Sequence, residues 1–141
     1  MENNSVFIEK LRSSDLRPTK QRIKISEVLF NRKKTFHFTI AELNKILEGE
    51  LGKNISLATI YNTVNAFKKK GYLKEISINS ENSYYDTNTS NHHHFYNEST
   101  KELIDLKGND ISNIKINKTI PRKKIKSIEV LVKIANSNYY S

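Results

Sequence analysis

Apolar residues recur at intervals of three or four in four segments of the first half of the chain. This spacing places them on one face of a helix, so it predicts four amphipathic helices. Thr39 caps the third helix, Glu42 completes a capping box with it, and Pro18 suits the start of the second. Gly49 and Gly52 end the third helix. The predicted helices cover residues 5–13, 19–31, 39–49 and 56–70.

The fourth predicted helix has two faces of different chemistry. The apolar face, expected in the core, consists of Leu57, Ile60, Val64 and Phe67. The other face carries Ser56, Thr59, Asn62, Thr63 and Asn65, followed by Lys68, Lys69 and Lys70. An ordinary exposed helix carries pairs of Glu and Lys, whereas this face has no carboxylate. It therefore favours contact with an anionic partner, although a small helical domain with a solvated polar face is the plainer alternative.

Two alternating segments, residues 72–78 and 83–88, predict a β-hairpin directly after the fourth helix. Helices followed by such a hairpin make a winged helix, in which the last helix enters the major groove of DNA and the hairpin lies beside the backbone. Residues 1–87 are therefore predicted to form a winged-helix DNA-binding domain.

Strand patterns dominate from residue 91 onward. Residues 92–97, 101–106 and 126–135 predict strands, whereas residues 107–124 suit either a short helix with a loop or partial strand. Three strands with little helix cannot close a core in about fifty residues. Residues 88–141 are therefore predicted to form a small α/β dimerisation domain, so that the chain has an α+β fold and forms a homodimer.

Composition narrows the classes of function. No run of apolar residues is long enough to span a membrane or form a signal peptide, so we expect a cytoplasmic protein with no membrane partner. The chain has no cysteine, which excludes disulfides, thiolate nucleophiles and Cys-ligated zinc. Its net charge of +9 favours a polyanionic partner such as nucleic acid.

Three of the four histidines form one run, "HHH". On a strand, His92 and His94 share one face, while His93 points to the other. A hairpin with its turn at residues 99–100 places Asp105 opposite His94 and on the same face as His92. Two imidazoles and one carboxylate suit Zn, Fe(II), Mn or Co without any thiolate. A run of ordinary polar strand residues is the alternative.

Four segments taken in order resemble one family over nearly the whole chain. They are "LRPTKQR", "HFTIAEL", "ISLATIYNTVNAFKKKGYL" and "NHHHFYNESTKELIDL". Together they resemble the ferric uptake regulator (Fur) superfamily of metal-responsive transcription factors, and the third closely resembles its recognition helix. The resemblance implies a winged helix followed by a metal-binding dimerisation domain.

The resemblance also implies a set of metal ligands for iron, manganese or zinc. They are His37, Asp86, His92, His94 and Asp105. A metal held by these residues would fix the angle between the two parts of the chain and hence the spacing of two recognition helices. The family's structural zinc is not expected, because Asn97 and Thr100 stand where the paired cysteines would be.

The cysteine-free form with "HHHFY" is most similar to the iron response regulator branch, whose triple-histidine stretch is associated with haem. This likeness implies a repressor that controls haem and iron metabolism genes, with His92, His93 and His94 as candidate haem ligands. The alternative is a peroxide-sensing, metal-dependent repressor of the PerR type, because acids such as Asp86 and Asp105 suit a site where peroxide reacts with bound Fe(II) and oxidises a histidine.

DNA contacts follow from the same resemblance, with an A·T-rich palindromic operator as the expected partner. The implied DNA-binding residues are Arg17, Lys20, Arg22, Ser56, Thr59, Tyr61 and Asn62. Tyr61 and Asn62 are expected at bases or phosphates, and Arg17 in the minor groove. The plainer alternatives are a core aromatic for Tyr61 and an internal salt-bridge partner for Arg22.

A His/Asp metalloenzyme is disfavoured, because no general base stands beside an open coordination position.

Overall fold

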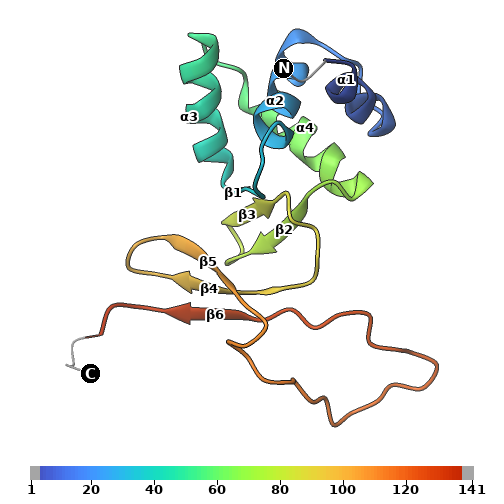
Figure 1. The fold of residues 1–141 in the computed structure, drawn as a ribbon, viewed down its shortest axis with the longest axis vertical. Coiled ribbons are helices and arrows are strands. Elements are labelled where there is room, and N and C mark those ends of the chain that lie inside the picture. The colour runs from blue at the N-terminus through green and yellow to red at the C-terminus, as the bar shows by residue number, and fades with distance from the viewer. Residues whose placement is uncertain (1–3, 138–141) are drawn as a thin grey trace. The chain divides into compact units, whose positions relative to one another are not determined.

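Four helices form within residues 4–137, the part of the chain that the computed structural model describes. They are α1 (Asn4–Ser13), α2 (Lys20–Phe30), α3 (Ile40–Leu51) and α4 (Leu57–Lys70) (Figure 1). Thr19, Thr39 and Ser56 cap α2, α3 and α4, each accepting a hydrogen bond from the backbone N–H three residues on. Gly52 and Gly71 end α3 and α4 with φ angles of 65° and 93°, a left-handed conformation that glycine adopts most readily.

One predicted helix end is wrong by a few residues. Helix α3 continues through Gly49 to Leu51, and Gly52, the second predicted stop, is its C-cap and donates its N–H to the carbonyl of Glu48. Pro18 precedes the cap Thr19, so α2 begins within one residue of its predicted start. A glycine in the interior of a helix costs about 1 kcal/mol relative to alanine. Burial of Leu47, which is completely covered on the same helix, outweighs this cost.

Residues up to Thr89 form one compact unit, unit 1, and residues from Ser90 form another, unit 2. The core of unit 1 is built around α4, where Ile60, Val64 and Phe67 are completely buried. Phe67 meets the ring of Phe30 edge-on at 5.2 Å between centroids. These residues confirm most of the apolar face predicted for the fourth helix.

Two residues of α4 lie opposite to their predicted environment. Leu57 is 52% exposed, because it is the first residue of the helix and spacing alone does not reveal whether another element covers a helix end. Thr63 is completely buried, although it was placed on the polar face. Its hydroxyl donates to the carbonyl of Thr59 at 2.7 Å, so the buried oxygen has a hydrogen-bond partner.

Unit 1 also contains a three-stranded antiparallel sheet in the order β1-β3-β2. Its strands are β1 (His37–Phe38), β2 (Lys74–Ser77) and β3 (Ser83–Asp86). The hairpin of β2 and β3 is the predicted wing. The sequence did not reveal β1, because a strand of two residues has no measurable alternation. Phe38 is buried and stacks on Tyr85 at 5.8 Å, which explains why this short segment joins the sheet.

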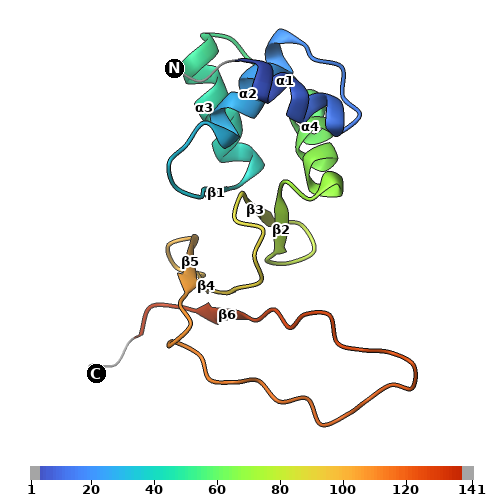
Figure 2. The same cartoon turned by 45° about the vertical axis from the view of Figure 1, so that its right-hand side comes forward.

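Unit 2 is a sheet in the order β5-β4-β6. Its strands are β4 (His93–Asn97), β5 (Glu102–Leu106) and β6 (Leu131–Ile134) (Figures 1 and 2). Strand β5 is antiparallel to β4, and β6 is parallel to it. The predicted strand at residues 126–135 is thus shortened, since β6 pairs with β4 only from His94 to Asn97.

Residues 107–124 form neither the short helix with a loop nor the partial strand that the sequence suggested, and the predicted strand is absent over residues 126–130. In both views residues 107–130 run as a long loop from the end of β5 to the start of β6 (Figures 1 and 2). Pro121 removes a backbone donor from this stretch. Among the described residues, no helix is long and apolar enough to cross a membrane.

Candidate metal centre

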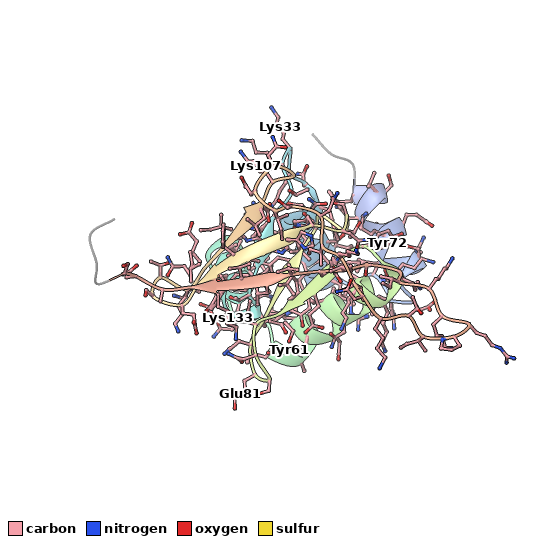
Figure 3. The ribbon with its side chains drawn as sticks, turned by 90° about the horizontal axis from the view of Figure 1, so that it is seen from below. Lys33, Tyr61, Tyr72, Glu81, Lys107 and Lys133 are labelled. Carbon is pink, nitrogen blue, oxygen red and sulfur yellow. The ribbon has the colours of Figure 1, made fainter. Side chains whose placement is uncertain are left out.

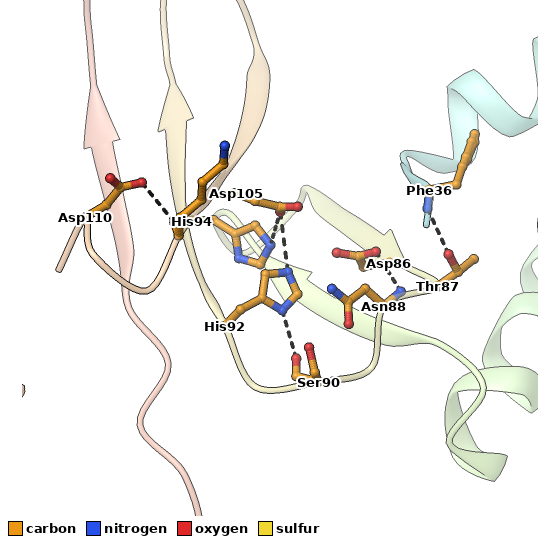
Figure 4. Close-up of polar contacts among 10 residues, drawn as sticks. Phe36, Asp86, Thr87, Asn88, Ser90, His92, His94, Asp105 and Asp110 are labelled. Carbon is orange, nitrogen blue, oxygen red and sulfur yellow. Dashed lines mark hydrogen bonds and ion pairs between the residues drawn. The ribbon is translucent and has the colours of Figure 1, made fainter. Parts of the chain in front are cut away.

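Strands β4 and β5 bring two histidines and an aspartate together in unit 2. The observed register places His94 directly opposite Asp105, as the strand geometry predicted. His94 Nε2 lies 3.1 Å from Asp105 Oδ1, and His92 Nε2 lies 3.4 Å from the same oxygen (Figure 4). The two imidazole rings are 4.3 Å apart between centroids. Both histidines therefore converge on one carboxylate.

The three side chains have the donor set of a divalent metal site. One ligand atom from each lies within 4.8 Å of the others, which suits coordination of one ion by two imidazoles and a carboxylate. His92 Nδ1 lies 2.8 Å from the carbonyl of Ser90, which can only accept, so Nδ1 carries a proton. This hydrogen bond turns the Nε2 lone pair toward Asp105 and supports the ring as an outer-shell partner of a metal ligand does. Ring nitrogens and carboxylate oxygens that converge with their lone pairs repel one another unless protons or a cation lie between them.

In unit 1, His37 and Asp86 are brought together by the β1–β3 pairing. They are direct partners in the register, so their side chains project from the same face of the sheet. Asp86 Oδ1 accepts the backbone N–H of Asn88 at 2.8 Å, which orients the carboxylate. The resemblance singled out both residues, but the strand that makes them neighbours was missed.

The β1–β3 pairing is extended by one further pair of residues. Phe36 N–H donates to Thr87 Oγ1 at 2.8 Å, and Thr87 N–H donates to the carbonyl of Phe36 at 3.0 Å (Figure 4). These two bonds close the end of the sheet beside His37 and Asp86. Thr87 is thus a supporting residue that sequence reasoning did not single out.

His93 has a different role from its neighbours. Its Nδ1 accepts the backbone N–H of Val130 at 2.9 Å, while His94 N–H donates to the carbonyl of Val130 at 3.1 Å. Both backbone groups of Val130 are thus held by β4, at the point where β6 begins. A neutral imidazole whose Nδ1 accepts carries its proton on Nε2. His93 therefore closes the junction of β4 and β6, and only its Nε2–H remains for another partner.

The candidate DNA-contact residues of α4 lie at the surface of unit 1. Tyr61 is 46% exposed, which removes the alternative of a core aromatic (Figure 3). Asn62 is exposed beside it. Ser56 and Thr59 hold the start of the helix, with their hydroxyl oxygens 2.8 Å apart. The polar face predicted for this helix is thus present, without Thr63.

The basic residues around α2 divide into two kinds. Arg17 and Lys20 are exposed. Arg22 instead donates from Nη1 to the carbonyl of Arg17 at 3.0 Å, so its partner is a backbone oxygen and not the carboxylate expected of a salt bridge. This bond fixes the turn that carries Arg17.

An ion-pair network, missed in the sequence, joins α4 to the wing. The carboxylate of Glu75 on β2 accepts from Lys68 at the end of α4 and from Ser83 Oγ, the latter at 2.6 Å. The Lys68 ammonium, followed by the Ser83 hydroxyl, holds the pKa of Glu75 below its ordinary value of 4.5.

Glu75→Gln is expected to reduce the free energy of unfolding by about 0.5 kcal/mol at neutral pH, the usual size of a partly exposed pair. A depressed pKa contributes stability above the unfolded-state value, and this contribution is lost as pH falls through the folded-state value. The difference between wild type and variant should therefore vanish in acid. Urea unfolding at about pH 7 and about pH 3 measures it, and a difference that grows toward low pH would contradict the network.

Comparison with known proteins shows the family of this chain. The sequence model of the ferric uptake regulator family matches residues 13–135. The chain belongs to the ferric uptake regulator family. Solved Fur proteins share the fold: that of Pseudomonas aeruginosa with manganese has a TM-score of 0.65 at 16% identity, covering 94% of this chain and 99% of that one. The Helicobacter pylori protein has a TM-score of 0.66 at 17% identity, covering 96% and 92%.

Curated relatives within the Fur family are nearer in sequence. The chain is 35% identical over 99 residues to the peroxide operon regulator of Bacillus subtilis, covering 70% of this chain and 66% of that protein, just under two thirds of its length. It is 34% identical over 107 residues to the peroxide-responsive repressor PerR of Staphylococcus aureus, covering 76% and 70%. Both names describe regulators, and neither describes an enzyme.

Proposed function

We propose that this Fur-family chain is a metal-dependent repressor of transcription that senses peroxide, and is not an enzyme. The observation that carries the proposal is the convergence of His92 and His94 on Asp105, an iron-compatible set of nitrogen and oxygen ligands. The two peroxide regulators at 34–35% identity favour this function over the iron response branch. Control of haem and iron metabolism genes stays a prediction of the sequence.

The proposed ligands are His37, Asp86, His92, His94 and Asp105. The cluster in unit 2 and the shared sheet face of His37 and Asp86 in unit 1 support this set. Metal binding by all five would couple the two units, and so would link the metal to DNA affinity. A bound Fe(II) would supply the reaction with peroxide, whereas Mn(II) or Zn(II) at the same ligands would not.

Peroxide treatment of the Fe(II)-loaded protein is expected to add one oxygen atom to His37 or His92 and to release DNA. Peptide mass spectrometry after tryptic digestion locates the added mass, and the Mn(II)-loaded protein is the matched control. Unmodified histidines in the iron form, with DNA binding retained, would exclude the peroxide sensor and leave a regulator that responds to the metal alone.

Haem binding by His92, His93 and His94 is the weaker proposal for the same stretch, because of how His93 is hydrogen-bonded. A neutral histidine that ligates iron through Nε2 carries its proton on Nδ1, which then cannot accept from Val130. Haem ligation by His93 would therefore break the junction of β4 and β6. A haem titration tests it: a Soret shift present in wild type and lost in His93→Asn would support haem, and an unchanged shift would exclude this ligand.

DNA binding through α4 is proposed for a homodimer on an A·T-rich palindrome. The exposed, carboxylate-free face of α4 supports this, with Tyr61 and Asn62 as base or phosphate contacts. Ser56 and Thr59 are proposed at phosphates, where free helix amides favour anions. Arg17 and Lys20 are proposed to contact DNA beside α4. Arg22, the third flanking residue of the proposed DNA-binding set, supports the turn that carries Arg17.

Tyr61→Ala is expected to weaken specific binding by about 1–3 kcal/mol and to spare binding to random DNA. Lys20→Ala should weaken both and lower the salt slope by about 1, because it removes one phosphate contact. Fluorescence anisotropy across a salt series separates the two variants. Equal losses on cognate and random DNA for Tyr61→Ala would show that this ring does not read bases.

A further inference from the structure

The positive charge of this chain is concentrated in one segment of unit 2. Residues 107–126 contain seven basic residues and one acidic residue, so they carry six of the chain's nine net positive charges. The basic residues are Lys107, Lys115, Lys118, Arg122, Lys123, Lys124 and Lys126. The single acid, Asp110, accepts the backbone N–H of Lys107 at 2.9 Å. The segment is thus a strongly cationic surface.

The structure displays these charges to solvent. Every residue from 107 to 126 is exposed except Ile111, and the segment forms the long loop between β5 and β6 (Figures 1 and 2). Lys123 N–H donates to the carbonyl of Ile120 at 3.0 Å, which closes a tight turn with Pro121 inside it. Arg122 has a φ of 64°, as the third position of a type II turn requires. The turn presents three consecutive cationic side chains, Arg122 to Lys124.

Charge and shape together decide which partner fits this surface. If the segment contacted the same segment of a second copy, six net positive charges would face another six, and the two surfaces would repel each other. Exposed isoleucines such as Ile120 and Ile125, at 61% and 59%, also suggest a lipid surface. An amphipathic membrane anchor, however, gathers its apolar residues on one helical face, and residues 107–126 form no helix. A nucleic-acid backbone requires only phosphates within reach of Lys and Arg.

We propose that residues 107–126 form a second DNA-contacting segment, which binds the phosphate backbone without reading sequence. The proposal rests on the DNA-binding function proposed for α4 and extends it to unit 2. Contacts of this kind add affinity for all DNA alike, by release of counterions. The segment would hold the protein on DNA while α4 selects the operator.

The triple variant Arg122→Gln, Lys123→Gln, Lys124→Gln of the full chain tests the proposal, with Lys33→Gln, Lys34→Gln, Lys45→Gln as a control of equal charge in unit 1. Binding to cognate and random duplexes is measured by anisotropy across a salt series, with Mn(II) present. We expect the test variant to lower the salt slope by about 1–3 and affinity for both duplexes by the same factor. The control should change either quantity much less.

Three results would overturn the proposal: an unchanged slope, a loss no larger in the test variant than in the control, or a loss accompanied by a lower sedimentation mass. Binding to mixed phosphatidylcholine–phosphatidylserine vesicles that the test variant loses, with the DNA slope unchanged, would also overturn it in favour of a membrane. If the wild-type protein bound cognate and random duplexes equally well, operator recognition by α4 would be refuted. The backbone contact of residues 107–126 would still be tested by the salt slopes on random DNA.

Discussion

His94→Ala is expected to lower Mn(II) affinity by more than about 100-fold, because changes at outer-shell partners alone cost about 10–100-fold. His94 lies opposite Asp105 in the β4–β5 register, with its Nε2 3.1 Å from that carboxylate. Alanine removes one of the two converging imidazoles and leaves Asp105 facing a single ring. Isothermal titration calorimetry with Mn(II) measures the loss, and metal-dependent DNA binding should be lost with it.

His93→Asn is the matched control for this prediction. His93 is the neighbouring imidazole, but it lies on the other face of β4, and asparagine keeps an acceptor near the position of Nδ1 for the Val130 N–H. We expect its Mn(II) affinity to equal that of wild type. Equal losses in both variants would show that His94→Ala acts by disturbing β4, and normal affinity in His94→Ala would remove His94 from the ligand set.

Phe67→Ala is expected to lower the free energy of unfolding by about 3–5 kcal/mol, the usual cost of removing a buried aromatic ring. Phe67 is completely buried and contacts the rings of Phe30 and Tyr72 edge-on, at 5.2 and 6.2 Å. A cavity at this position would loosen α4 from α2, and with it the surface proposed to bind DNA. Urea unfolding followed by circular dichroism measures the loss.

Leu57→Ala is the control on the same helix. Leu57 belongs to the same periodic pattern in the sequence, yet it is 52% exposed, so its truncation should change stability by no more than about 0.5 kcal/mol. A loss as large as that of Phe67→Ala would mean that Leu57 is covered in solution by a surface outside the described chain. Comparison of the two variants thus tests whether the loss of stability follows the burial of a residue or its place in the helical pattern.

Several features of the fold could be predicted because they depend on nearby residues. The cap at Thr39 and the glycine end at Gly52 follow from local backbone chemistry. The pairing of His94 with Asp105 could also be predicted, because a short hairpin turn leaves few registers open.

Other features depend on contacts between distant residues, which local patterns do not encode. Strand β1 exists because Phe38 stacks on Tyr85, far along the chain, and no periodicity announces a strand of two residues. The burial of Thr63 and the exposure of Leu57 depend on where other elements cover α4. Residues 107–124 were assigned two alternatives, a short helix with a loop or partial strand, and both were wrong.

By itself, the sequence determined the helices, the wing, the hairpin of the histidine run and the absence of thiolate chemistry, because each follows from residue type and short spacing. Only the tertiary structure showed that β1 sets His37 opposite Asp86 and that the His93 ring closes the start of β6. The reason is physical: hydrogen bonds and side-chain contacts between residues distant in the chain form only once the sheets assemble, and for His93 they decide which ring nitrogen is left to bind a ligand.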